Sequence, residues 1–300
     1  MHVKNILKVA FKSILKSRMR SLLTALGIII GVAAVVVMVA IGDGAQQQVE
    51  NQIASLGSNL IVITPGISMS GGVSRGMGSF NRFTFDDVQK IKDEAIYING
   101  VSPLVRSGGQ IIGGVGNWFT QVQGVSADYL NIRSWKLASG EFFTERDVMA
   151  RQKVCLLGSE VAKNLFPNDD PIGQQVRIRN VPFKIIGVLK EKGQTSVGTS
   201  NDDIILAPSR TVHERLSGGR FISSIQVSAL TPAQIPRAKE ELRRIMREAH
   251  KLGQGEEDDF TIQDQADLAE AATETSKILT ILLGSVAGVS LIVGGIGIMN

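Results

Sequence analysis

Two long stretches of this chain contain no charged residue, and they constrain its fold more than any other feature. Residues 21–42 and 278–300 hold 22 and 23 residues without an Asp, Glu, Lys or Arg. In a helix that rises about 1.5 Å per residue, either stretch crosses a hydrocarbon core of roughly 30 Å. The alternatives are a buried core helix for either stretch and a signal peptide for the first, although its apolar run exceeds the usual limit of roughly 15 residues. Together the stretches predict an integral membrane protein with two transmembrane helices.

The distribution of charge predicts the orientation in the membrane. The first 20 residues hold six basic side chains and no acidic one, whereas residues 43–277 hold 26 basic and 28 acidic side chains. A basic cluster before the first span places the N-terminus in the cytoplasm, and residues 43–277 then lie outside it. Because lysines recur every fourth position, residues 1–20 are predicted to form an amphipathic helix whose cations contact lipid headgroups. These cations are Lys4, Lys8, Lys12, Lys16, Arg18 and Arg20. Nucleic acid is not an expected partner, because the rest of the chain is slightly acidic.

The extracytoplasmic segment contains the same order of elements near both of its ends. A strand at residues 59–64, a helix that Thr84 caps and a strand at 101–105 form one predicted βαβ unit. A strand at 221–229, a helix at 231–252 and a strand at 260–262 form the second. We therefore predict an α+β membrane protein with a split ferredoxin-like subdomain, residues 43–106 and 219–277. The Gly- and Pro-punctuated residues 107–218 are predicted to be an inserted β-rich subdomain.

The sequence predicts no catalytic, cofactor or metal site, so we do not expect an enzyme. No Gly-Lys pair exists, which excludes a phosphate loop of the GxxxxGK[ST] kind. His2, His213 and His250 are isolated, and Cys155 is the single cysteine. The segment LSGGR at residues 216–220 is close to the ABC-ATPase signature, but a predicted strand follows it, so we interpret it as a turn.

Small residues in the two predicted spans are spaced for close helix packing. The positions that we expect to pack are Gly27, Gly31, Gly284, Gly288, Ser290 and Gly294. The alternative is that lipid-exposed glycines are merely tolerated. Neither span holds an ionisable group, so no proton or ion relay is expected through them. This pattern favours a protein that transmits motion across the membrane.

Several segments resemble the MacB/FtsX-type ABC-transporter permeases. The first span is similar to that family's first membrane helix in the segment RMRSLLTALGIIIGV, residues 18–32. The segments LGSEVAKNLF at 157–166, DPIG at 170–173 and VPFKIIGVL at 181–189 resemble the family's periplasmic core domain. GGIGIMN at 294–300 resembles the opening of a longer family motif.

The resemblance implies a homodimeric permease in a bacterial cytoplasmic membrane, driven by a cytoplasmic ATPase that binds the ATP. In the MacB branch it also implies a periplasmic adaptor and an outer-membrane channel, with efflux or release of peptides, antibiotics, lipoproteins or other amphiphiles. Family permeases have four membrane helices, so we expect the natural chain to continue beyond Asn300. The alternatives are a two-helix extracytoplasmic receptor and an FtsX-like regulator of cell-wall hydrolases.

Overall fold

The computed structural model describes most of the extracytoplasmic segment. The described residues are 59–66, 69–70, 73–74, 83–193, 200–219 and 221–267, with short groups of helical positions between 26 and 44 and between 270 and 292. The chain forms two compact units. One consists of residues 51–268, and the other consists of residues 1–50 together with residues 269–300. The predicted interfacial helix lies outside the described residues.

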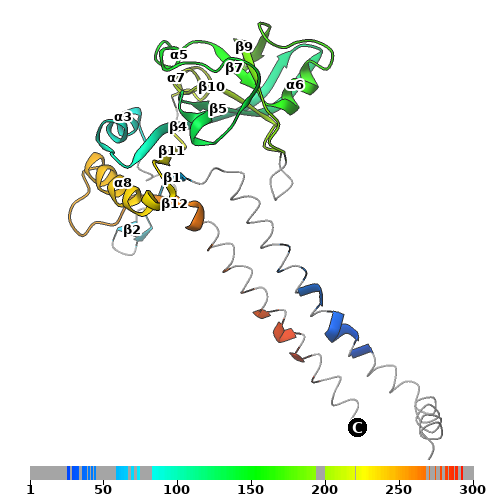
Figure 1. Cartoon of the computed structure of the whole chain (residues 1–300), viewed down its shortest axis with the longest axis vertical. Coiled ribbons are helices and arrows are strands. Elements are labelled where there is room, and N and C mark those ends of the chain that lie inside the picture. Colours follow the sequence, from blue (N-terminus) through cyan, green and yellow to red (C-terminus); the bar gives the residue numbers. More distant parts are fainter. Residues whose placement is uncertain are drawn as a thin grey trace, which may run out of the picture. The chain divides into compact units, whose positions relative to one another are not determined.

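The first lobe of the 51–268 unit is an antiparallel sheet with two helices. Its elements are β1 (Leu60–Pro65), α3 (Phe85–Glu94), the first part of β4 (Ile98–Gly113), β11 (Ser224–Ala229), α8 (Ile235–Ala249) and β12 (Phe260–Asp264). The strand order is β12-β1-β11-β4, with every neighbouring pair antiparallel. Two βαβ units interleaved in this order form a ferredoxin-like arrangement. We call it the ferredoxin-like lobe, and Figure 1 shows α3 and α8 beside its strands.

Local signals explain where the two helices form. Thr84 and Asp87 make a reciprocal capping box at the start of α3, in which each side chain accepts a hydrogen bond from the other residue's backbone N–H. A 3₁₀ turn, Pro232–Gln234, precedes α8. The buried face of α8 consists of Ala238, Leu242, Ile245 and Met246. Ala249, the last residue of α8, is half-buried.

The second lobe is a ring of strands, which we call the barrel lobe. It contains the second part of β4, β5 (Gly116–Val125), β6 (Leu137–Gly140), β7 (Val154–Leu157), β8 (Gln175–Ile178), β9 (Val181–Leu189) and β10 (Ile204–Pro208). Hydrogen-bonded pairs run β4-β5-β10-β7-β9-β8, and β8 pairs with β4 again, so these six strands close on themselves. Closure leaves no open edge in the ring, and β6 extends it by pairing with β9.

Short helices connect or follow the strands of the barrel lobe. They are α4 (Tyr129–Ile132), α5 (Glu145–Met149), α6 (Ser159–Leu165), α7 (Ser209–Thr211) and a π-helical turn at Val212–Leu216. Gly218 and Gly219 follow that turn with φ angles of 68° and 72°, a left-handed conformation that glycine adopts readily. The described part of the LSGGR segment, residues 216–219, therefore turns away from the helix before the next strand, as the sequence predicts.

Successive side chains of a barrel strand point to opposite faces of the sheet, and both faces are buried. In β7, Cys155 and Leu157 belong to one hydrophobic cluster and Leu156 belongs to a second. The second cluster also contains Tyr129 of α4 and Val148 of α5. Both faces of the ring are thus covered, which explains why residues 154–157 form an unbroken apolar run.

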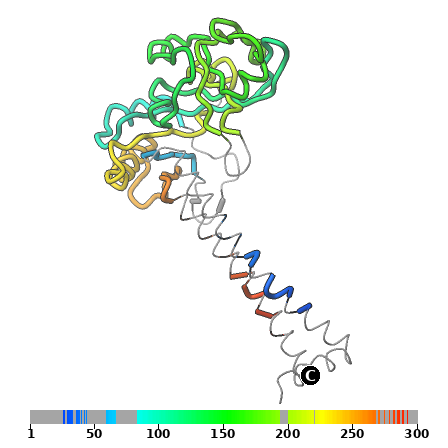
Figure 2. Tube along the Cα trace, turned by 45° about the vertical axis from the view of Figure 1, so that its right-hand side comes forward, coloured from blue at the N-terminus to red at the C-terminus, as the bar shows by residue number. Residues whose placement is uncertain are grey.

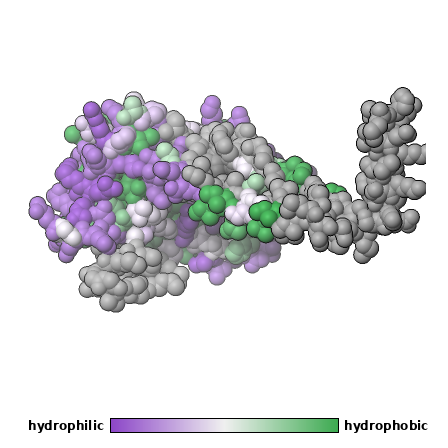
Figure 3. Space-filling view, turned by 90° about the horizontal axis from the view of Figure 1, so that it is seen from below, coloured by the Kyte–Doolittle hydropathy of each residue, from purple (hydrophilic) through white to green (hydrophobic). Residues whose placement is uncertain are grey.

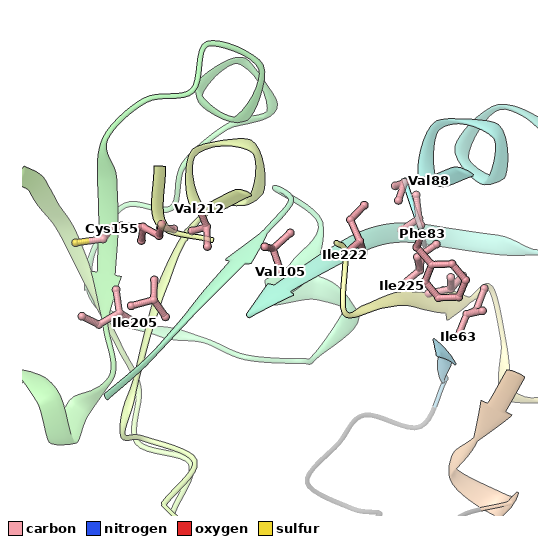
Figure 4. Close-up of a cluster of buried hydrophobic side chains, with 14 of the residues drawn as sticks. Ile63, Phe83, Val88, Val105, Cys155, Ile205, Val212, Ile222 and Ile225 are labelled. Atoms are coloured by element: carbon pink, nitrogen blue, oxygen red, sulfur yellow. The ribbon is translucent and has the colours of Figure 1, made fainter. Parts of the chain in front are cut away.

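The two lobes share a strand and a core. β4 pairs with β11 through residues 98–104 and with β5 through residues 105–113, so it passes through the predicted boundary at residue 106. Figure 4 shows the common cluster, which extends from Ile63 and Phe83 through Val105 and Ile222 to Ile205. Figure 2 shows both lobes from another side, with the barrel lobe in green. The shared core makes the two lobes parts of one compact unit.

The surface of the folded unit is mostly hydrophilic on the face that Figure 3 shows, with single hydrophobic residues between the polar ones. A short hairpin of β2 (Met69–Ser70) and β3 (Val73–Ser74) lies within the Gly- and Ser-rich segment after β1. Among the residues that the structure describes, no helix combines the length and apolar character needed to cross a membrane. Both predicted spans fall on stretches of which only short, separated groups of residues are described, so they stay predictions.

Candidate functional site

The predicted site residues divide into described and undescribed positions. Gly27, Gly31, Gly284 and Gly288 are described, and each lies in helical backbone. The remaining positions lie outside the described residues: Lys4, Lys8, Lys12, Lys16, Arg18, Arg20, Ser290 and Gly294. Only the glycine part of the predicted packing site can therefore be located.

The four described glycines are less exposed than large apolar residues near them in the same helices. Gly31 is buried, and Gly27, Gly284 and Gly288 are half-buried. By contrast, large apolar neighbours such as Ile29 and Ile281 are exposed by 63% and 61%. A methyl group added at Gly284 would lie 3.8 Å from the Met38 sulfur, an ordinary van der Waals contact. Gly284 thus lies near Met38 of the other helix, whereas a methyl group at Gly288 would meet no described atom within 4 Å. Helix packing through the other small residues stays a prediction.

The two ends of the ferredoxin-like lobe's chain lie side by side. β1, where the lobe begins, pairs with β12, where it ends, and Ile61 is opposite Asp264 in the register. The segment after β12 is helical at residues 265–267. The connections to both predicted spans therefore leave from neighbouring strands at one end of the sheet.

A cluster of one lysine and two aspartates holds the start of the helix that follows β12. The Asp264 N–H donates to Asp267 Oδ2 at 2.8 Å, and the Asp267 N–H donates to Asp264 Oδ1 at 2.9 Å. Lys239 of α8 places its Nζ 3.2 Å from Asp264 Oδ2 and 2.6 Å from Asp267 Oδ2. We call these three residues the joint, because they bind α8 to the first turn of the segment that leaves the lobe.

The charges of the joint reinforce one another. Burial alone would lower the pKa of Lys239, but its hydrogen bonds to Asp267 and Asp264 outweigh burial and raise that pKa. Burial would likewise raise the pKa of Asp267, yet the Lys239 hydrogen bond and the Asp264 N–H hold it below its usual value. Lys239 and Asp267 therefore stay ionised near neutral pH.

Sequence reasoning missed the joint. The pattern Asp264-x-x-Asp267 is a local helix-start signal of the capping kind. No local sequence pattern links Lys239 to these aspartates, because Lys239 lies on α8. The loop after α8 and the strand β12 separate it from Asp264 and Asp267 in the sequence. Only the packing of α8 against the sheet brings them together.

Histidine and cysteine side chains are few and separate in sequence in the described part of the chain. It contains no group of three or more His, Cys, Asp or Glu residues that could hold a metal ion. Cys155 is fully buried, and burial raises the pKa of its thiol far above the usual range, so the reactive thiolate does not form. His213 and His250 lie apart, one in the π-helical turn and the other after α8, and His2 lies outside the described residues.

Comparison with known proteins identifies relatives that match almost the whole chain. The family described as the MacB-like periplasmic core domain matches residues 21–245. A macrolide export ATP-binding/permease protein MacB of Bdellovibrio bacteriovorus is 40% identical over 97% of this chain and 45% of its own length. The protein of the same name from Syntrophobacter fumaroxidans is 34% identical over 98% of this chain and 49% of its own length. The chain thus spans about half the length of these curated relatives.

Solved structures share the fold of the described lobes. The periplasmic region of MacB from Actinobacillus actinomycetemcomitans superimposes with a TM-score of 0.59 at 24% identity, covering 73% of this chain and 94% of that one. The extracellular domain of the noncanonic ABC-type transporter YknZ from Gram-positive bacteria gives a TM-score of 0.56 at 19% identity, covering 69% of this chain and all of that one. At these identities the likeness concerns the fold alone.

Proposed function

The chain belongs to the MacB-like periplasmic core domain family, and from this premise we propose that it is the permease subunit of an ABC transporter in a bacterial cytoplasmic membrane. The observation that carries the proposal is the family match over residues 21–245, which includes the first predicted span and most of the folded unit. In this proposal the N-terminus is cytoplasmic and the two lobes are extracytoplasmic, as the positive charge before residue 21 favours.

The proposed mechanism is mechanical rather than chemical. ATP hydrolysis by a cytoplasmic ATPase moves the predicted spans, and the spans move the lobes. The adjacent strands β1 and β12 support this mechanism, because both connections leave the same end of one sheet. The joint supports it too, since Lys239 ties the departing helix to α8. A displacement of that helix would therefore turn the lobe as a body.

The proposed partners follow from the same premise. They are a cytoplasmic ABC ATPase, a second copy of the permease, membrane lipid, a periplasmic adaptor protein and an outer-membrane channel. The relatives' names concern macrolide export. For this chain we propose a broader class of cargo, namely peptides, antibiotics, lipoproteins or other amphiphiles.

The test of the proposed function is to identify the partner subunits. The endogenous complex is purified from native membranes after mild crosslinking, and its subunits are identified by mass spectrometry. We expect a protein or domain with a phosphate loop to be crosslinked to the cytoplasmic side of this chain. Recovery of a sensor kinase or of cell-wall hydrolase regulators, without an ATPase, would contradict the transporter and favour one of the alternative functions.

The joint gives a second test, which addresses the mechanism. Lys239→Met removes the cation and leaves Asp264 and Asp267 facing each other, so the first turn of the departing helix should loosen. We expect faster amide hydrogen exchange at residues 264–267 and weaker ATP-dependent export, while the lobes stay folded. Lys163→Met is the matched control, because Lys163 pairs with Glu191 on the exposed surface of the barrel lobe. Equal export by both variants would argue against coupling through the joint.

A further inference from the structure

The side-chain amine of Lys192 occupies an unusual position in the barrel lobe. Lys192 is half-buried and comes shortly after β9, and its side chain reaches the segment that follows α4. Its Nζ donates a hydrogen bond to the Arg133 backbone carbonyl at 2.8 Å. The ring of Trp135, which is 8% exposed, has its centre 5.2 Å from the same nitrogen. The amine thus lies against an aromatic ring and an uncharged carbonyl group rather than against a carboxylate.

The acidic residues near Lys192 are bound to other groups. Asp202 is the one whose charge acts on the amine. Its Oδ1 accepts a hydrogen bond from the Lys192 backbone N–H and its Oδ2 accepts one from the Gly193 N–H, both at 2.8 Å. The neighbouring Glu191 pairs with Lys163, whose Nζ lies 2.9 Å from its Oε2. Within the described part of the chain, no carboxylate therefore forms an ion pair with the Lys192 amine.

A second cation acts on the same amine. Burial and the charge of Arg133 lower the pKa of Lys192 from the ordinary 10.5 to about 8, although the charge of Asp202 opposes the shift. The face of the Trp135 ring favours the ammonium as well, but only weakly. The buried Nε of Arg133 has no hydrogen-bond partner among the described residues. Two cations thus repel each other here, and one added negative charge would turn that repulsion into attraction.

The Lys192 amine is available as a nucleophile near neutral pH. Its pKa of about 8 is close to that of an α-amino group, about 7.7–8.0. Near neutral pH such an amine is unprotonated on the order of a hundredfold more often than an ordinary lysine side chain. Carbon dioxide is an electrophile that is small and uncharged, so it reaches a half-buried amine. Its adduct with an amine is a carbamate, an anion, which suits a position beside Arg133.

We propose that Lys192 binds carbon dioxide as a carbamate that pairs with Arg133. The nitrogen lone pair forms a bond to the carbon of carbon dioxide, one pair of C–O π electrons moves onto oxygen, and the nitrogen releases one proton to solvent. The new ion pair joins the end of β9 to the segment after α4. Because α4 packs against β4 and β11, the modification ties a barrel strand to the place where the lobes meet. The proposal concerns only the folded unit and is independent of the proposed transporter function.

Chemical trapping tests for the carbamate. The whole chain, in phosphatidylcholine nanodiscs that offer no lipid amine, is equilibrated with bicarbonate at neutral pH, and triethyloxonium then converts carbamates into stable ethyl esters that mass spectrometry locates. A peptide with a free α-amino group in the same sample confirms that trapping works. We expect at least about tenfold more ester at Lys192 than at Lys163, whose hydrogen bond to Glu191 raises its pKa. No ester at Lys192, or equal labelling of both lysines, would overturn the proposal.

Arg133→Gln tests the pairing. Loss of this cation should raise the pKa of Lys192 and should also leave the carbamate without its counter-ion, so both effects lower the yield of ester at Lys192. We expect a fall of about tenfold for each unit by which the pKa rises. Arg106→Gln is the matched control, because the charge of Arg106 acts on Tyr129 as that of Arg133 does but takes no part in the shift at Lys192. Equal yields from the two variants would overturn the pairing with Arg133.

Thermal stability gives a readout that does not depend on trapping. A ligand that binds the folded protein alone raises its unfolding temperature. Bicarbonate, which equilibrates with carbon dioxide, should therefore raise the unfolding temperature of the original protein above its value in sodium chloride of equal ionic strength. Lys192→Arg should lose this response, because a protonated guanidinium forms no carbamate, and the matched control Lys163→Arg should keep it. A response that persists in Lys192→Arg, or that is absent from the original protein, would contradict the proposed site.

Discussion

His250 joins two acidic residues inside the ferredoxin-like lobe. Its Nδ1 lies 2.7 Å from Asp259 Oδ1 and its Nε2 lies 3.8 Å from Asp87 Oδ2, and its side chain is 5% exposed. The rings of Phe83 and Phe260 pack about it. Asp87 also caps α3, so the histidine connects the end of α8, the start of α3 and the segment before β12. A single side chain thus links three elements that are distant in sequence.

The pH dependence of stability should report this cluster. Burial alone would lower the pKa of His250, but hydrogen bonds to Asp87 and Asp259 outweigh it and raise the pKa above the ordinary 6.5. The protonated imidazole therefore contributes its full stabilisation below about pH 6.5, and this contribution is lost as pH rises through the raised pKa. We expect His250→Gln to cost about 3–5 kcal/mol below that pH, the effect of removing one partner of a buried ion pair. The cost should shrink at higher pH.

Thermal unfolding of the two proteins across this pH range measures the difference directly. His213→Gln is the control, because His213 contacts the Phe85 ring but belongs to no acidic cluster in the described structure. A destabilisation by His250→Gln that stays constant from acid to alkaline pH would show that the imidazole acts only through packing.

At the scale of elements, the barrel lobe depends on close backbone contacts at glycines. A methyl group at Gly158, between β7 and α6, would collide with the Asp202 carbonyl oxygen. The Gly158 N–H also donates to the Ile204 carbonyl at 2.8 Å, so the backbone cannot move away without losing a hydrogen bond. Gly158→Ala should therefore destabilise the protein by about 1–3 kcal/mol, as overpacking does. Gly108→Ala in β4 is the control, since a Cβ there meets no described atom within 4 Å. Urea unfolding that gives equal stabilities for both variants would contradict this account.

The elements that the sequence predicted are those with local signals. Thr84, Asp86 and Asp87 mark the start of α3 because capping and the helix dipole act within one turn. The length of β4 was underestimated, since Pro103 and the pair Gly108-Gly109 interrupt its apolar pattern. Closure of the barrel rests on pairs such as Ile111 with Ile178, which no local pattern reveals. The joint is likewise a product of tertiary packing, so spacing alone could not locate it.

At the scale of the whole molecule, the proposed mechanism assigns the transmission of motion to the predicted spans. The glycine spacing predicted that the spans pack, but it could not name the contact residue, because an apolar helix face has no signal for its partner. The structure supplies one, Met38, whose sulfur lies 3.8 Å from a methyl group built at Gly284. If the spans transmit motion, this contact must either persist or shift during the cycle. A covalent link at the contact distinguishes these two cases.

A cysteine pair at this contact tests both the packing and the mechanism. In a Cys155→Ala background, Met38→Cys with Gly284→Cys should form a disulfide under mild oxidation. Replacing Val36, which is 61% exposed, gives the matched pair Val36→Cys with Gly284→Cys, which should not crosslink. We further expect the crosslinked permease to keep its lobes folded and to lose ATP-dependent export, which a reducing agent restores. Rapid crosslinking of the control pair would contradict the packing, and full export by the crosslinked protein would show that the contact stays fixed while the lobes move.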